Sequence, residues 1–91
     1  MAVQERSPSP IERWIEPSPY YPGPQEARLV EYGVSVWVLI AYLRAVGDDV
    51  ARVAEDYDLP LDAVEAAIAY YREHQPLIDA HIAMNAVASA G

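Results

Sequence analysis

Four side chains near the C-terminal end are of types that transfer protons or bind metal ions: Glu73, His74, Asp79 and His81. Two histidines seven residues apart can share one face of a helix, but Pro76 lies between them and is expected to break the helix. A metal site needs further preorganised ligands, and the chain contains no Cys. Glycine-rich phosphate loops and nucleophile elbows are also missing. The sequence therefore predicts a protein that is not an enzyme and that uses no metal or cofactor.

The residues before these histidines form two amphipathic segments on either side of a break at Asp58-Leu59-Pro60. Apolar residues recur in both segments at three- and four-residue spacing, so each segment has one apolar stripe on a helix. Two such helices joined by a short turn make a helix-turn-helix. Asp58 replaces the usual turn glycine and can still adopt the left-handed conformation. The predicted core of this motif, with the small Ala54 at the helix crossing, is Val53, Ala54, Tyr57, Leu59, Val64, Ala67 and Ile68.

A helix-turn-helix reads DNA through the exposed N-terminal residues of its second helix. None of those positions carries Arg, Lys, Asn or Gln, the usual readers of guanine and adenine, and two acids there would face the repulsion of the phosphates. We therefore expect weak DNA binding, or DNA binding only as a complex, with Arg13, Arg28 or Arg44 elsewhere in the chain as further candidates. The positions in question are Pro60, Leu61, Asp62, Glu65, Ala66 and Ala69.

The charge of the chain points to basic partners. Its formal net charge is −8, and its six basic residues are all Arg. After Gly47 there are nine acids and two bases, so that part has a net charge of about −7. Such a surface repels phosphate and attracts cationic proteins. The alternative is an acidic domain whose charge serves only solubility.

No targeting or membrane segment is apparent. The first ten residues are polar and Pro-rich, which is unlike a signal peptide. The longest apolar run, Val36–Leu43, is too short to span a bilayer. Since the absence of Cys also fits a reducing compartment, we expect a cytoplasmic protein without membrane contact.

Residues 1–26 are predicted to form an extended arm. Residues 1–24 hold six of the eight prolines, which fix φ and restrict their predecessors. One helical turn is predicted at residues 11–15. The arm also carries Trp14, Ile15, Tyr20 and Tyr21, whereas disordered tails are usually poor in aromatic residues. These side chains either dock on the chain's own helices or bind a partner.

Residues 27–88 are predicted to form one small domain. Residues 27–36 suggest one or two short strands with a bend at Tyr32-Gly33. Because so small a hairpin is only marginally stable, we expect it to pair with a second copy or to cover a helix. The apolar segment 36–46 predicts a central buried helix capped by Ser35.

The remaining helix boundaries follow from local signals. Gly47 is expected to end the central helix, and Asp48 and Asp49 to cap the next one. A last helix is predicted from Leu77 to about Ala86, and residues 89–91 are expected to be a frayed tail. The predicted fold is mainly α, a bundle of about four helices with a short N-terminal β element and an extended Pro-rich arm.

Three stretches between Val36 and Asn85 resemble a known family: VWVLIAYLRAVG, DVARVAEDYDLPLDAVEAAIAYYREH and LIDAHIAMN. Taken in order, with Ala-Glu-Asp-Tyr, Val-Glu-Ala-Ala and Ala-Tyr-Tyr among them, they are similar to domain-of-unknown-function family 433 (DUF433). The family commonly has a Gly-Thr-Arg-hydrophobic-Pro-Val stretch before the first helix. Residues 31–36 stand there in this chain without the Arg, so no role of that Arg carries over.

The resemblance implies a homeodomain-like helix-turn-helix fold, a homodimer and a PIN-like ribonuclease toxin as partner, with autoregulation of the pair's promoter. The function it implies is that of an antitoxin that binds and neutralises the basic toxin. The alternative is a dimerising adaptor or DNA-binding regulator that has no toxin partner. The candidate partner-binding residues are the apolar and aromatic side chains of the arm and the last helix, namely Trp14, Ile15, Tyr20, Tyr21, Leu77, Ile78 and Ile82.

Overall fold

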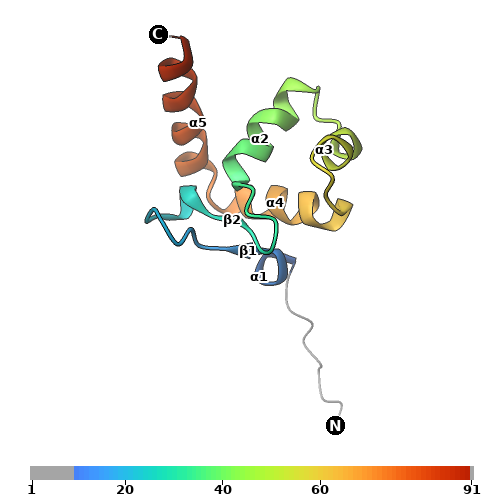
Figure 1. The fold of residues 1–91 in the computed structure, drawn as a ribbon. Helices are drawn as coiled ribbons and strands as arrows, with labels where there is room; N and C mark the ends of the chain where they lie inside the picture. The colour runs from blue at the N-terminus through green and yellow to red at the C-terminus, as the bar shows by residue number, and fades with distance from the viewer. Residues whose placement is uncertain (1–9, 91) are drawn as a thin grey trace.

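The computed structural model describes residues 10–90, with side chains described through Ala86. The α2, α3 and α4 helices form the body, α5 runs away from it toward the C-terminus, and α1 and the β strands lie beside α4 (Figure 1). The expected mainly α fold with a short N-terminal β element is confirmed, and the helical turn expected at residues 11–15 is present as α1. The elements in chain order are α1 (Pro10–Trp14), β1 (Ile15–Glu16), the 3-10 helix η1 (Pro24–Glu26), β2 (Arg28–Leu29), α2 (Val36–Ala45), α3 (Val50–Asp56), α4 (Leu61–Glu73) and α5 (Gln75–Ala90).

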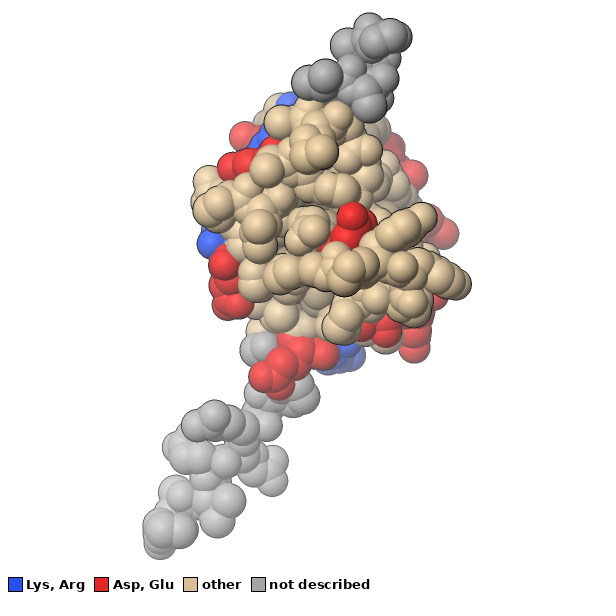
Figure 2. Space-filling view, turned by 90° about the vertical axis from the view of Figure 1, so that its left-hand side faces the viewer, with Lys and Arg blue, Asp and Glu red and all other residues tan. Residues whose placement is uncertain are grey.

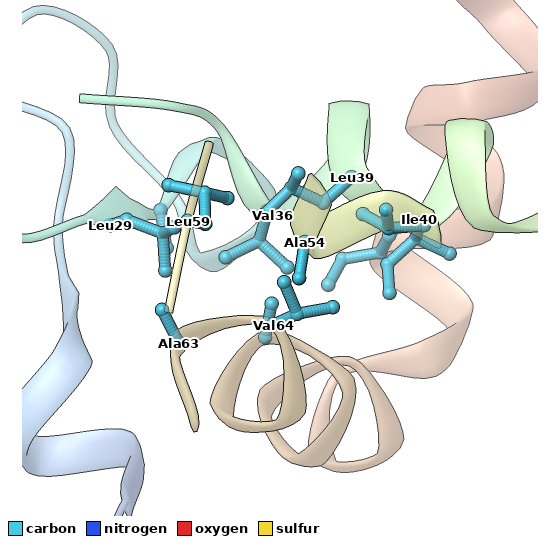
Figure 3. Close-up of a cluster of buried hydrophobic side chains, with 12 residues drawn as sticks. Leu29, Val36, Leu39, Ile40, Ala54, Leu59, Ala63 and Val64 are labelled. Atoms are coloured by element: carbon cyan, nitrogen blue, oxygen red, sulfur yellow. The ribbon is translucent and has the colours of Figure 1, made fainter. Parts of the chain in front are cut away.

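One hydrophobic core joins β2 to α2, α3, α4 and α5. Its side chains converge from different elements, with Leu29 and Leu59 at one end and Ile40 at the other (Figure 3). Each apolar stripe is therefore buried against a neighbouring element, as the helical spacing requires. Of the predicted helix-turn-helix core, Val53, Ala54, Leu59, Val64 and Ala67 are buried, while Tyr57 and Ile68 pack against them half-buried.

Two helices end in the same hydrogen-bonded motif. After α2, Gly47 has φ 67°, its N–H donates to the Arg44 carbonyl at 3.3 Å, and the Asp48 N–H donates to the Leu43 carbonyl at 2.8 Å. After α3, Asp58 has φ 55°, and the Leu59 N–H donates to the Ala54 carbonyl at 2.8 Å. These are Schellman caps, which satisfy the last helical carbonyls. The left-handed Asp58 is thus the residue that turns the chain from α3 into α4.

The helix starts agree with the sequence in position and differ in detail. The Asp49 side chain caps α3 by accepting from the Arg52 N–H at 3.1 Å, whereas Ser35 precedes α2 without a side-chain cap. The last helix begins at Gln75, only one residue after α4, and not at Leu77. Pro76 fits there because first-turn N–H groups need no helical acceptor. The helix continues to Ala90, and Gly91 of the expected frayed tail lies outside the described residues.

The short sheet is built from the arm and not from a second copy. β1 pairs antiparallel with β2, with Ile15 opposite Leu29 and Glu16 opposite Arg28. The expected bend near Gly33 is present, because the Leu29 N–H donates to the Val34 carbonyl at 2.8 Å. Of the two expectations for this segment, packing on the helices is confirmed, since Leu29 is buried in the helical core, and the strand next to β2 comes from the arm. Residues 1–9 of the predicted arm lie outside the described part.

Candidate functional site

One side of the molecule carries few charges although the chain is strongly acidic. Uncharged residues cover most of the face that contains α5, η1 and the loop before η1, and acidic residues lie mainly at its rim, with some acidic atoms also visible near its centre (Figure 2). Several large side chains are exposed there: Tyr20 at 78%, Tyr21 at 63% and Met84 at 71%. Monomeric proteins rarely expose such patches without an interaction partner. We call this surface the neutral face and define it by Tyr20, Tyr21, Trp37, Leu77, His81 and Met84.

Helical spacing explains the contribution of α5 to the neutral face. Leu77, His81 and Met84 follow one another at intervals of four and three residues, so they lie on one side of α5. Ile78 is on another side of the helix, where it is 0% exposed. Leu77 by contrast is 47% exposed. This side of α5 therefore carries two exposed apolar side chains together with His81, and none of the three belongs to the core.

Hydrogen bonds hold the arm in place at the other edge of the face. The Ser18 hydroxyl accepts from the backbone N–H groups of Tyr20 and Tyr21 at 3.1 and 3.2 Å. The Tyr70 hydroxyl donates to the Pro24 carbonyl at 2.8 Å and so ties the end of the loop to α4. Such local side-chain bonds stabilise turns. The two tyrosines are consequently presented on an ordered loop that is bonded at both ends.

A pocket of about 410 Å³ lies within the neutral face. Its rings come from distant parts of the chain, and the Trp37 and His81 rings meet edge to face at 4.9 Å. The His81 Nε2 lies 3.5 Å from a carboxylate oxygen of Glu26. Concave sites with aromatic walls and a few convergent polar groups are the usual form of binding pockets. The complete lining is Ser18, Tyr20, Tyr21, Glu26, Arg28, Gly33, Ser35, Trp37 and His81.

The seven predicted partner-binding residues are divided between surface and core. Tyr20, Tyr21 and Leu77 belong to the neutral face. The other four contact the chain's own fold: Trp14, Ile15 and Ile82 are half-buried and pack against the core, and Ile78 is completely buried in it. The structure therefore corrects Ile78 from a candidate partner contact to a core residue, because its side of α5 faces α2 and α4.

Sequence reasoning missed three members of this site. Met84 could have been found from its helical spacing to Leu77 and His81. Glu26 carried no local signal, because its neighbour His81 is 55 positions away in the chain. Trp37 belongs to the central helix that was expected to be buried, but its side chain is only half-buried and lines the pocket.

The reading face of the helix-turn-helix is partly covered by the chain itself. α1 packs against α4, and a cleft of about 320 Å³ between them is lined by Arg13 and Trp14 on one side and by Asp62 and Glu65 on the other. Ala66, which the sequence placed among the exposed positions, is completely buried, and Ala69 is half-buried. Alanines allow a second backbone to approach closely, which explains why α1 can dock at this point. Pro60, Leu61, Asp62 and Glu65 remain exposed.

Three arginines are engaged by the chain's own carboxylates, which leaves less positive charge for nucleic acid. Arg28 pairs with Glu16 at 2.8 Å and Arg52 with Asp56 at 2.9 Å. Arg44 pairs with Asp79 at 2.5 Å and lies over the Tyr71 ring. Arg13, the remaining candidate, lies over its neighbour Trp14 at 5.3 Å.

We therefore expect no tight DNA binding by this chain alone. With α1 over the reading helix and few uncompensated cations, little counterion release is available to drive binding. Fluorescence anisotropy with a labelled duplex of the DNA upstream of its own gene should show no nanomolar affinity at about 150 mM salt. Nanomolar binding retained at that salt concentration would contradict the prediction.

A polar cluster of Arg44, Tyr71 and Asp79 joins α2, α4 and α5. The Tyr71 hydroxyl donates to Asp79 at 2.7 Å and accepts from Arg44 at 2.8 Å. Hydrogen bonds from Tyr71 and Arg44 lower the pKa of the Asp79 carboxyl. A carboxyl whose pKa is lowered by folding stabilises the fold above its unfolded pKa of about 4, and this stabilisation is lost as the pH falls through the folded pKa.

Asp79→Asn is expected to change the acid sensitivity of the fold. At pH 7 the variant should lose up to about 1 kcal/mol of unfolding free energy, a small value because the pair is partly exposed. Below about pH 4 the difference from the unmodified chain should shrink, since the native carboxylate is then being protonated. Urea unfolding at a series of pH values measures this, with the exposed Glu55→Gln as control. A pH-independent difference would contradict the assignment.

The two histidines lie in different surroundings. His74 stacks on Tyr70 with ring centroids 4.4 Å apart, whereas His81 contacts Trp37 and Glu26. Within residues 10–90, no three His, Cys, Asp or Glu side chains are grouped so that they could hold a metal ion.

None of the helices described is both long and apolar enough to cross a membrane.

Comparison with known proteins identifies the family. No curated protein and no solved structure matches the chain. A family model described as a protein of unknown function (DUF433) matches residues 26–71. This segment begins at the end of η1 and runs through β2, α2 and α3 into α4. It thus starts earlier than the resemblance noted in the sequence and stops before α5. Since it covers half of the 91 residues, the chain belongs to the DUF433 family.

Proposed function

We propose that this chain is an antitoxin-like protein that uses its neutral face to bind and neutralise a basic PIN-like ribonuclease. The observation that carries the proposal is the neutral face itself, a mostly uncharged surface with two exposed tyrosines on a chain of net charge −8. The membership in DUF433 supports the proposal through the resemblance to antitoxins. Regulation of a promoter, if it occurs, is assigned to the complex, because this chain offers little positive charge to DNA.

The two properties of the surface serve different steps of binding. The acidic rim attracts a basic ribonuclease and raises the association rate more than the final affinity. Tight binding needs large side chains that become desolvated in the interface. Tyr20, Tyr21 and Met84 are suited to this because they are exposed and apolar in large part, and the two tyrosines line the pocket.

The experiment is co-expression with a basic PIN-like nuclease, the partner that the proposal names. Leu77→Arg and Leu61→Arg form a matched pair, because both leucines are 47% exposed and both lie in the first turn of their helix. Leu77 belongs to the neutral face and Leu61 does not. The unmodified chain and Leu61→Arg should protect the cells, whereas Leu77→Arg should not. Failure of the unmodified chain to protect would overturn the proposal, and equal protection by both variants would exclude the neutral face.

The second candidate function is a dimerising adaptor without a toxin, in which the neutral face pairs with a second copy. It is favoured by α5, which extends away from the body with an apolar outer side (Figure 1). Light scattering at micromolar concentration tests this: the unmodified chain should then be a dimer that Leu77→Arg dissociates. A monomer in that measurement would exclude the adaptor, and a dimer that gives no protection from the nuclease would favour it.

A further inference from the structure

The pocket in the neutral face is lined by one carboxylate and one guanidinium, and the guanidinium is held by an acid that lies outside the lining. Glu26 lines the pocket together with Arg28, and the guanidinium of Arg28 is bonded to Glu16 at 2.8 Å. Glu16 stands directly opposite Arg28 in the two-stranded sheet, which holds this pair in place. The remaining charge partner of Glu26 is His81, whose Nε2 is 3.5 Å away, beyond the range of a good hydrogen bond. Because Arg28 is paired with Glu16, which lies outside the lining, the guanidinium is not bonded to the Glu26 carboxylate.

The Glu26 carboxylate is positioned to accept from a further donor. Its side chain is 20% exposed, so it is mostly covered by protein but still faces the pocket. A carboxylate can accept about four hydrogen bonds. A donor that enters here meets a negative charge that is shielded from solvent, where a charge-assisted hydrogen bond is stronger than one on the surface.

The walls of the pocket favour a flat cation. Tyr20, Tyr21 and Trp37 present aromatic rings, and aromatic faces attract cations within about 6 Å. The pocket already contains one such contact, because the guanidinium of Arg28 lies 6.0 Å from the centroid of the Tyr20 ring while it is bonded to a carboxylate. Tyr20 is 78% exposed, so most of its surface is open to a second group. Guanidinium stacks on rings and bonds to carboxylates through a planar fork, which an ammonium group lacks.

We infer that this pocket binds the side chain of one arginine, which donates to Glu26 and stacks against the rings of Tyr20 and Trp37. The identity of the protein that supplies this arginine rests on the proposed function: the arginine lies on the surface of the basic ribonuclease. When the complex forms, it inserts into the pocket and is no longer available to the nuclease. The acidic rim attracts any basic protein, whereas the pocket adds specificity. A partner that places an arginine in the pocket completes a buried charge pair, and a partner without that arginine does not.

The binding of arginine itself can be measured without the nuclease. N-acetyl-L-arginine amide is titrated into the full-length protein and followed through the indole N–H signal of Trp37 in ¹H–¹⁵N spectra. Trp14, the other tryptophan, lies outside the pocket and serves as the internal reference. N-acetyl-L-citrulline amide, which has nearly the same shape without the charge, is the matched ligand. We expect a saturable shift of the Trp37 signal in the millimolar range for arginine, and little shift for citrulline.

Two variants of equal charge separate the pocket from the general acidity of the chain. Glu26→Gln should weaken arginine binding about tenfold, the cost of one charge-assisted hydrogen bond. Glu55→Gln removes the same charge from an exposed position of α3 and should leave the affinity unchanged. The dispersion of the same spectra shows whether each variant is folded. No saturable shift, an equal response to citrulline, or equal affinity of Glu26→Gln and the unmodified chain would overturn the inference.

Co-expression with the nuclease distinguishes this inference from the proposed function. If the unmodified chain protects cells and Glu26→Gln does not, both stand. If the unmodified chain binds arginine at the pocket but gives no protection, the proposed function fails and the pocket remains an arginine site. If the chain protects cells but the Trp37 signal does not respond to arginine, the proposed function stands and the inference about the pocket is overturned.

Discussion

Replacing Ile78 by alanine is expected to lower the free energy of unfolding by about 2–5 kcal/mol. Ile78 is 0% exposed and joins α5 to the core formed by α2 and α4. The change removes buried methyl and methylene groups and leaves a cavity that the surrounding side chains can fill only in part. Because small domains have total stabilities of only about 5–15 kcal/mol, much of the stability of this chain depends on that one contact. Urea unfolding followed by circular dichroism measures the loss.

The neighbouring residue supplies the control. Leu77 precedes Ile78 in the same helix but is 47% exposed, so Leu77→Ala should change the stability by less than about 0.5 kcal/mol. Similar unfolding curves for the two variants would mean that α5 is not docked through Ile78. The two variants also distinguish an effect on stability from an effect on partner binding, since Leu77 is assigned to the partner surface and Ile78 to the core.

Replacing Ala54 by leucine is expected to cost about 1–3 kcal/mol through overpacking. Ala54 lies where α3 meets the core, and its carbonyl accepts the hydrogen bond from Leu59 that closes the Schellman cap. A larger side chain would push α3 away from its neighbours, because the core offers no free volume for three additional carbon atoms. The effect should therefore include a change in the turn as well as in the helix packing.

Glu55→Ala, one position further along α3, is the reference for this prediction. Glu55 is exposed, and its replacement should change the free energy of unfolding by less than about 0.5 kcal/mol. Thermal and urea unfolding of both variants test the placement of the helix-turn-helix. If Ala54→Leu and Glu55→Ala unfold alike, Ala54 does not lie at the helix crossing.

The sequence by itself determined the helices of the body and the turns between them. These features depend on local interactions: the 3.6-residue periodicity defines one apolar stripe for each segment, and Gly47 and Asp58 can adopt the left-handed backbone that ends a helix. Even the unusual turn residue Asp58 was predictable, because the cost of its conformation is small beside the caps and the burial of Leu59 that it permits.

Only the tertiary structure decided how the arm and the last helix are used. Periodicity states which residues share a face, but it does not state which element covers that face. Leu77 and Ile78 are adjacent apolar residues. The orientation in which α5 docks makes Leu77 a surface residue and Ile78 a core residue. In the same way, α1 packs against the reading helix α4, and the arm pairs as β1 with β2, where Glu16 is bonded to Arg28.

The pocket in the neutral face could not be predicted from the sequence for the same reason. Glu26 and His81 come together from 55 positions apart, and Trp37 and Tyr20 reach the pocket from a helix and a loop. No local sequence pattern predicts that these residues lie close together, because their proximity depends on the packing of distant segments in the whole domain. The sequence therefore determined the acidity, the helices and the aromatic residues of this protein, and the tertiary structure determined which of those residues form a surface that a partner can contact.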